Sequence, residues 1–152
     1  MKVERILFPT DFSEGSTHAL HCAVDLTRHY NAKLYIQHVI YDVTKAIGIH
    51  VPHISSDEVY KELNEWAESE IEKFCMEEIR SLPDVEKKIL KGIPYEEILK
   101  FADEERIDLI VMGTYGRVGL QRLVFGNTAE RVVRRAPCPV MTVRVPEHRA
   151  EE

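Results

Sequence analysis

Cysteine is scarce in this sequence, and no stretch is apolar for long enough to cross a membrane. The three cysteines, Cys22, Cys75 and Cys138, are odd in number and lack the spacing of metal ligands. This pattern favours a reducing compartment over a disulfide-linked secreted protein. The N-terminal residues Met1 to Arg5 do not read as a signal peptide. We therefore expect a cytoplasmic protein that does not bind membranes.

Basic residues are fewer than acidic ones: the chain has 20 Lys and Arg and 26 Asp and Glu, which gives a net charge of −6. This balance argues against nucleic acid as a partner, because nonspecific binding needs a broad basic surface. It leaves room for a small anion at a local site. With 152 residues, 44% of them hydrophobic, the chain has the size and composition of one globular domain. We expect that domain over residues 1–146, followed by a polar tail at 147–152.

Apolar runs that suit buried strands alternate along the chain with segments of helical periodicity. Strands are expected at 5–9, 33–40, 85–91, 107–112 and 139–145. The segment from Tyr41 to Ser56 has no clear period and is predicted to be a long loop. A capping box, Ser55-x-x-Glu58, then starts the longest helix, whose apolar stripe should face the core. This order predicts an α/β protein of three layers, with a doubly wound, five-stranded parallel sheet.

Glycine is concentrated in one place, because four of the seven glycines, Gly113, Gly116, Gly119 and Gly126, fall within 14 residues. An apolar run at 109–112 precedes this stretch and a helical pattern at 129–136 follows it. The arrangement is that of a buried strand, a glycine loop and a helix N-terminus. Bare backbone N–H groups and the positive end of a helix dipole suit an anion, above all a phosphate.

The spacing of these glycines excludes the commoner phosphate loops. No Gly-Lys-Ser/Thr occurs in the chain, and the dinucleotide pattern G-x-G-x-x-G is absent from the loop. The pattern Gly113-x2-Gly116-x9-Gly126-Asn127 instead resembles the nucleotide-binding signature of the universal stress protein family, which usually has Ser or Thr where Asn127 stands. The segments at 6–13 and 136–140 resemble the same family, so that the similarity covers nearly the whole chain. The alternative is a glycine-rich connection that holds no ligand.

The resemblance implies strand order 3-2-1-4-5, the adenine nucleotide alpha hydrolase-like arrangement, with ATP bound where the first and fourth strands lie side by side. Mg²⁺ or Mn²⁺ would bridge the phosphates without a protein side chain as ligand. Asp11 would accept hydrogen bonds from the ribose or base, and the backbone of Val39 would read the adenine edge. Met112 and Gly113 would line the ribose side. The full set of nucleotide-binding residues implied is Pro9, Thr10, Asp11, Val39, Met112, Gly113, Gly116, Arg117, Gly126, Asn127 and Thr128.

Several of these residues also have a purely structural interpretation. Asp11 is equally suited to a turn or a helix cap, and Arg117 to a solvated position. Asn127-x-x-Glu130 reads as a capping box, so that Asn127 serves its own helix. Val39 is also a natural core neighbour.

No catalytic constellation is evident beside the glycine loop, so that we predict a nucleotide-occupied stress-response or regulatory protein. The resemblance implies a homodimer formed through the last strand, Val140 to Val145, which would otherwise be an uncovered sheet edge. Two alternatives remain: a slow metal-dependent ATP hydrolase assisted by Asp11, and an interaction module that binds no nucleotide, which the departure at Asn127 keeps open.

Overall fold

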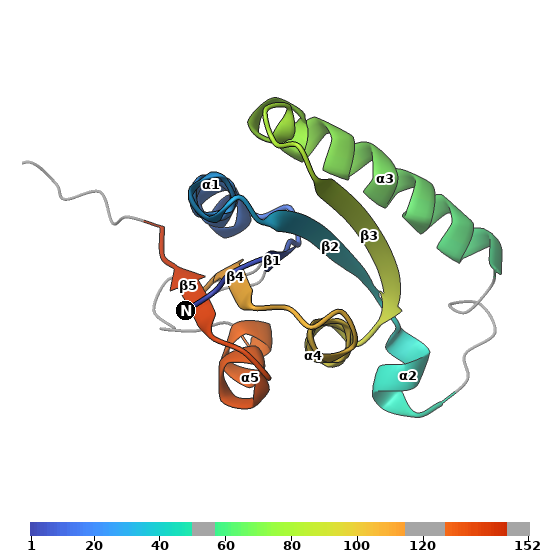
Figure 1. The fold of residues 1–152 in the computed structure, drawn as a ribbon. Coiled ribbons are helices and arrows are strands. Elements are labelled where there is room, and N and C mark those ends of the chain that lie inside the picture. Colours follow the sequence, from blue (N-terminus) through green and yellow to red (C-terminus); the bar gives the residue numbers. More distant parts are fainter. Residues whose placement is uncertain (50–56, 115–126, 146–152) are drawn as a thin grey trace, which may run out of the picture.

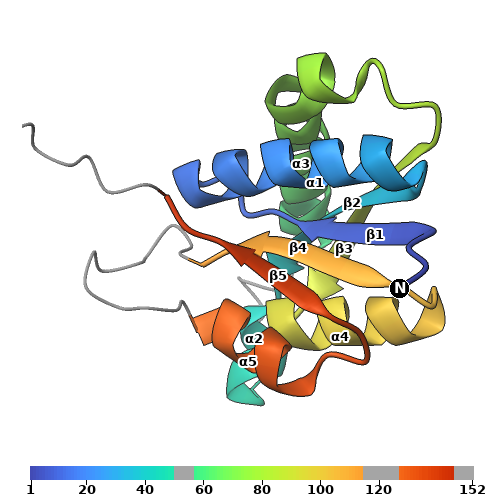
Figure 2. The same ribbon diagram turned by 60° about the vertical axis from the view of Figure 1, so that its left-hand side comes forward.

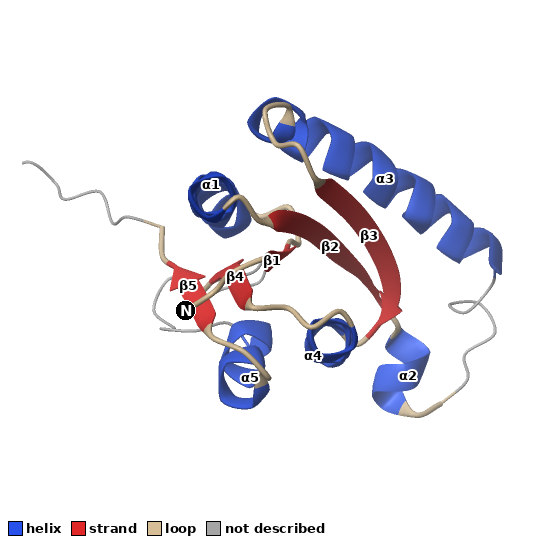
Figure 3. Ribbon diagram, in the orientation of Figure 1, coloured by secondary structure: helices blue, strands red, loops and turns tan. Residues whose placement is uncertain are grey.

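The structure is a computed structural model that describes residues 1–49, 57–114 and 127–145. Along these residues one helix, or in one case two, separates each strand from the next, as Figure 3 shows. The strands are β1 (Arg5–Pro9), β2 (Lys33–Tyr41), β3 (Val85–Gly92), β4 (Leu109–Gly113) and β5 (Val140–Val143). The helices are α1 (Glu14–Tyr30), α2 (Val43–Ile47), α3 (Asp57–Ile79), α4 (Pro94–Glu104) and α5 (Asn127–Arg135).

All the strand pairs are parallel, and the sheet has the order β3-β2-β1-β4-β5. Helices α1 and α3 cover one face, while α4 and α5 cover the other (Figures 1 and 2). The predicted three-layer, doubly wound α/β fold and its strand order are confirmed. Because the chain reverses its direction of winding at β1, the carboxyl ends of β1 and β4 lie at the switch point where such sheets bind ligands.

The two faces of the sheet carry separate apolar clusters, because side chains alternate along each strand. Ile6, Phe8 and Val111 pack toward α1 and α3. Leu7 and Ile110, their neighbours in sequence, pack toward α4 and α5. Strand β1 is therefore buried on both faces, as expected of a central strand in a parallel sheet.

The helix α2 was missed from the sequence, since it lies inside the segment predicted to be a loop. Asp42 caps its N-terminus by accepting a hydrogen bond from the N–H of Lys45 at 3.1 Å, and Gly48 ends it at φ 68°. A hydrogen bond from Thr44 lowers the pKa of the Asp42 carboxyl. The Asp at the N-cap and the Gly beyond the C-terminus were the available signals. Residues 50–56, including Ser55, lie outside the described residues.

The apolar stripe predicted along α3 is only partly buried. Ala67 and Ile71 are buried, whereas Val59, Leu63 and Trp66 are 37%, 38% and 38% exposed. The helix also ends at Ile79, before the apolar pattern ends at Leu82. Periodicity located the helix correctly, but it overstated how much of the apolar stripe is buried.

Other element boundaries differ by one or two residues from those expected. Strand β5 ends at Val143, and Arg144 and Val145 continue without strand pairing. Helix α5 begins at Asn127. Among the described residues, no helix is both long enough and apolar enough to span a membrane.

Asp108 joins the beginnings of β1 and β4, a contact that the sequence did not reveal. Its carboxylate accepts hydrogen bonds from the N–H groups of Glu4 at 2.8 Å and Arg5 at 2.9 Å. Its own N–H donates to the carbonyl of Arg5 at 2.9 Å. These bonds fix the register of the two strands whose opposite ends form the candidate site.

Replacing Asp108 by Ala should lower the free energy of unfolding by about 1–3 kcal/mol, because two backbone donors lose a charged acceptor. Urea denaturation measures this loss. Asp103→Ala, at an exposed position near the end of α4, is the matched control and should change stability by less than about 0.5 kcal/mol. Equal effects of the two substitutions would contradict the role assigned to Asp108.

Candidate functional site

The candidate site lies at the carboxyl ends of β1, β2 and β4. Pro9 is in register with Gln37 of β2, and Leu7 with Ile110 of β4. Of the predicted nucleotide-binding residues, Gly116, Arg117 and Gly126 lie outside the described residues. Pro9 and Gly113 end β1 and β4, and Met112 precedes Gly113. Thr10 and Asp11 follow β1, Val39 lies two residues before the end of β2, and Asn127 and Thr128 begin α5.

Pro9 ends the pairing of β1 with β4. In a parallel ladder, the N–H and C=O of one residue point to the same neighbouring strand, and successive residues alternate between the two neighbours. The carbonyl of Arg5 accepts a hydrogen bond from Asp108 just before β4, and the N–H of Thr10 donates to Gln37 of β2. Pro9 therefore faces β4, where it has no N–H to donate. The pairing of β1 with β4 accordingly stops at Leu7.

Val39 faces the space beyond the end of β1. Because Gln37 accepts from Thr10 on the β1 side, alternation directs the N–H and C=O of Val39 to that side as well. Strand β1 has already ended there, and β2 continues to Tyr41 paired only with β3. No hydrogen bond joins Val39 to β1 within the described part of the chain. The position thus presents a backbone donor and acceptor to any planar group placed beside β2.

The turn after β1 is held by its own side chains. The Oδ1 atom of Asp11 accepts hydrogen bonds from the N–H of Ser13 and the hydroxyl of Ser16, both at 3.0 Å. The Ser13 hydroxyl caps α1 by accepting from the N–H of Ser16 at 3.3 Å. Thr10 Oγ1 accepts from the N–H of Phe12 at 3.0 Å. The structural role foreseen for Asp11 is therefore present in the turn, and its carboxylate is fixed in place there.

Phe12 and His38 support this turn from the α3 side, and sequence reasoning overlooked both. Phe12 has a positive φ of 64°, a conformation that is uncommon for a large side chain. Its ring stacks on His38 with centroids 4.5 Å apart and meets the edge of Trp66 at 5.6 Å. The Nδ1 atom of His38 lies 2.8 Å from the carbonyl oxygen of Thr10, which is consistent with an Nδ1–H donor. These contacts offset the backbone strain at Phe12.

Gly113 approaches the beginning of α1 so closely that a side chain would not fit. A Cβ atom at Gly113 would lie 2.9 Å from both the carbonyl carbon and the oxygen of Gly15. The neighbouring Met112 is buried in the cluster that includes Ala129 and Val132 of α5. Glycine at position 113 is thus required by the packing of α1 against β4.

Helix α5 and the end of β4 share one apolar cluster, in which Ala129, Val132 and Met112 are buried. Asn127 is exposed and Thr128 is half-buried. The Glu130 carboxylate forms an ion pair with Arg134 at 3.0 Å. In the predicted capping box of Asn127 and Glu130, the glutamate therefore has a partner other than the start of the helix. The first N–H groups of a helix lack intrahelical acceptors and favour an anion.

Among the described residues, neither a cluster of metal ligands nor an activated thiol at Cys138 is present. No group of three or more His, Cys, Asp or Glu side chains is placed to hold a metal ion among them. Burial raises the pKa of the half-buried Cys138 thiol, which disfavours the reactive thiolate.

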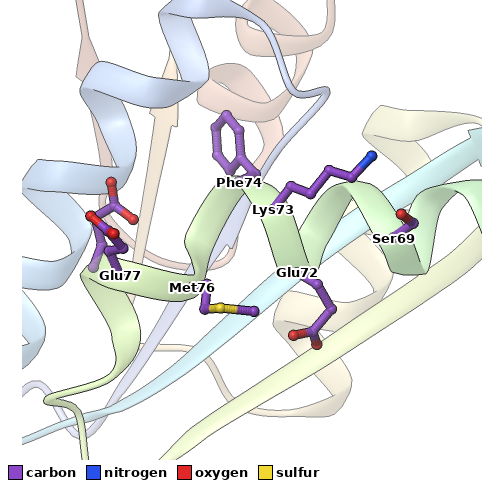
Figure 4. Close-up of a pocket in the computed structure, with 7 residues that line it drawn as sticks. Ser69, Glu72, Lys73, Phe74, Met76 and Glu77 are labelled. Carbon is purple, nitrogen blue, oxygen red and sulfur yellow. The ribbon is translucent and has the colours of Figure 1, made fainter.

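A surface hollow of about 490 Å³ on α3 is distinct from the strand ends. Figure 4 shows Phe74 projecting from one side of the helix, and Glu72 and Met76 from the other. All the residues that line it come from this one helix, and none is a predicted site residue. Polar groups from several elements do not converge there, as they do in most ligand sites.

Comparison with known proteins agrees with this geometry. Residues 2–144 match the sequence profile of the universal stress protein family. The chain belongs to the universal stress protein family. It is 33% identical over 149 residues to the universal stress protein MJ0531 of Methanocaldococcus jannaschii, covering 95% of this chain and 84% of that relative.

Solved structures of universal stress proteins and their relatives have the same fold. The structure of MJ0577, a universal stress protein of M. jannaschii, superposes with a TM-score of 0.84 at 28% identity, covering 97% of this chain and 99% of that one. A universal stress protein of Archaeoglobus fulgidus, solved in complex with dAMP, has a TM-score of 0.59 at 24% identity, covering 93% and 98% of the two chains. The second likeness, at this identity, establishes the shared fold alone.

Substituting Gly113 by Ala should destabilise this universal stress protein by about 1–3 kcal/mol, because the added methyl group meets the backbone of α1. Denaturant or thermal unfolding without any ligand measures the change. The added methyl group would meet backbone atoms of Gly15. Because Gly15 has no side chain to shorten, no second substitution there can relieve this contact. Unchanged stability would mean that α1 can move away freely and that the close approach is not required.

Proposed function

We propose that this chain binds ATP at the carboxyl ends of β1, β2 and β4 and acts as a nucleotide-occupied regulatory protein in a cytoplasmic stress response. One observation carries the proposal: the backbone of Val39, the fixed carboxylate of Asp11 and the first turn of α5 border the same edge of the sheet. Each offers what one part of a nucleotide needs, namely a hydrogen-bonding edge for the base, an acceptor for ribose hydroxyls and donors for phosphate.

The base would lie beside β2, where β1 has ended, and pair with the N–H and C=O of Val39. The ribose would lie near Asp11 and Gly113, and the phosphates would extend toward Asn127 and Thr128. That a protein of the same fold was solved with dAMP supports an adenine nucleotide as the ligand class. Mg²⁺ or Mn²⁺ would accompany the phosphates and offset their negative charge, and we assign it no side-chain ligand among the described residues.

We assign Asp11 a binding role rather than a catalytic one, because the ribose, beside which it would lie, is not where phosphoryl transfer takes place. A general base must be available to take up a proton near the reacting group. The protein would thus respond to the presence of ATP through occupancy.

The ligand is tested by denaturing the protein as purified and analysing the supernatant for ATP, ADP and AMP, and by calorimetric titration of nucleotide-free protein. We expect binding of ATP in the presence of Mg²⁺. Asp11→Asn should weaken the affinity for ATP about ten- to a hundredfold. The amide keeps an oxygen that accepts the hydrogen bonds of the turn, but it lacks the negative charge that strengthens hydrogen bonds from the ribose hydroxyls. Asp25→Asn, an exposed carboxylate on α1, is the control and should bind like the wild type. Absence of both bound and titratable nucleotide would refute the proposed function.

We further propose that two copies pair through β5. This strand is one edge of the sheet, and its Met141 is 41% exposed. Edges of this kind are usually covered. A two-fold axis would bring the strand against its own copy.

Sedimentation at micromolar concentration should therefore give the mass of a dimer. Met141→Lys should shift the protein toward the monomer, because a charge would enter the contact. Met76→Lys changes an equally exposed methionine on α3 and should leave the mass unchanged. A monomeric wild type would contradict this assembly.

A further inference from the structure

The carbonyl oxygen of Thr10 has an irregular partner at the point where β1 ends. In a parallel ladder, a residue whose N–H bonds to one residue of the neighbouring strand accepts, at its carbonyl, the N–H two positions farther along that strand. The N–H of Thr10 donates to the carbonyl of Gln37 at 2.8 Å, so that a regular ladder would pair the carbonyl of Thr10 with the N–H of Val39. This carbonyl instead lies 2.8 Å from Nδ1 of His38. Among the described residues, no hydrogen bond joins it to Val39.

The ring of His38 is held in the orientation that this bond requires. A carbonyl oxygen only accepts hydrogen bonds, so that Nδ1 of His38 carries the hydrogen. The ring stacks on Phe12 with centroids 4.5 Å apart and meets Trp66 edge to face at 6.1 Å. His38 is 9% exposed, and water therefore competes little for its bond to Thr10. A side chain of β2 thus takes the place that the backbone of the same strand would have in the ladder.

The residue that loses its ladder partner is partly accessible. Val39 is half-buried, whereas His38 and Ile40 on either side of it are buried. Its N–H points to the side of β2 that β1 has left, as does its carbonyl. That N–H stays available to a ligand only while the carbonyl of Thr10 is occupied by another donor.

We propose that His38 is a positioning residue of the nucleotide site, whose ring holds the carbonyl of Thr10 and so keeps the N–H of Val39 available to the base. This inference rests on the proposed function, in which the base pairs with the backbone of Val39. Without the imidazole donor, the carbonyl of Thr10 and the N–H of Val39 would pair with each other, because buried polar groups seek partners. The ladder would gain one bond, and the site would lose the donor that the base needs.

Two substitutions separate the hydrogen bond of His38 from its packing. His38→Phe keeps an aromatic ring for the stack with Phe12 but has no donor. His38→Asn loses the ring, and its amide places an N–H donor close to the position of Nδ1. We expect His38→Phe to weaken the affinity for ATP with Mg²⁺ about five- to tenfold, and His38→Asn to stay within about threefold of the wild type. His29→Phe, at an exposed position near the end of α1, is the control and should bind like the wild type.

The order of stability should be the reverse of the order of affinity. His38→Asn removes ring atoms beside Phe12 and Trp66, so that without nucleotide it should melt at a lower temperature than His38→Phe. A role confined to packing would make affinity follow the melting temperature. Weaker ATP binding by His38→Asn than by His38→Phe would therefore overturn the proposal, as would an unchanged affinity in His38→Phe.

Amide hydrogen exchange of the nucleotide-free protein tests the ladder without a ligand. The N–H of Val39 should exchange at least about tenfold faster than that of Thr10, which donates to Gln37. In His38→Phe the Val39 amide should become protected, because the carbonyl of Thr10 is then its acceptor. A protected Val39 amide in the wild type, or no gain of protection in His38→Phe, would overturn the role of His38. A wild type that shows these exchange rates but binds no ATP would overturn the proposed function, while the effect of His38 on the ladder would stand.

Discussion

The missing N–H of Pro9 is the constraint on which the site depends. Strand β1 is central, buried on both faces and joined to β2 and β4. Proline is rarely tolerated in such a strand, because it breaks one hydrogen bond of the ladder. Here it stands at the last position of β1 and faces β4, so that the chain leaves the sheet at once while β2 runs on to Tyr41. One residue type therefore produces both the end of the central strand and an open length of backbone on its neighbour.

Residues at this edge serve the fold and the site together. Asp11 holds the turn that begins α1, and Gly113 allows α1 to approach β4. A substitution at either position would alter packing as well as any ligand contact. Loss of binding in a variant of this region consequently has to be read beside its unfolding behaviour, because one measurement alone does not distinguish the two causes.

The sequence predicted those features of the fold that depend on local patterns of residues. Apolar runs located the five strands, and the family resemblance supplied their order. It did not predict the bonds from Asp108 to β1 or the stacking of Phe12 on His38, because both join segments that only the strand register brings together. Helix α2 was missed because five residues are too few for a period, although Asp42 and Gly48 marked its ends. The apolar stripe of α3 is buried less completely than its periodicity suggests, since periodicity does not reveal how closely other elements pack on a helix. At the site, the family resemblance indicated Asp11, Val39 and Gly113, and their contact with a nucleotide stays a prediction.

Trp66 is the only tryptophan of the chain, and its ring meets Phe12 immediately after Asp11 in sequence. Indole emission is sensitive to the polarity and the motion of its surroundings. The molecule thus contains a built-in spectroscopic reporter, placed on α3 and in contact with the turn, that registers rearrangement there without any attached label.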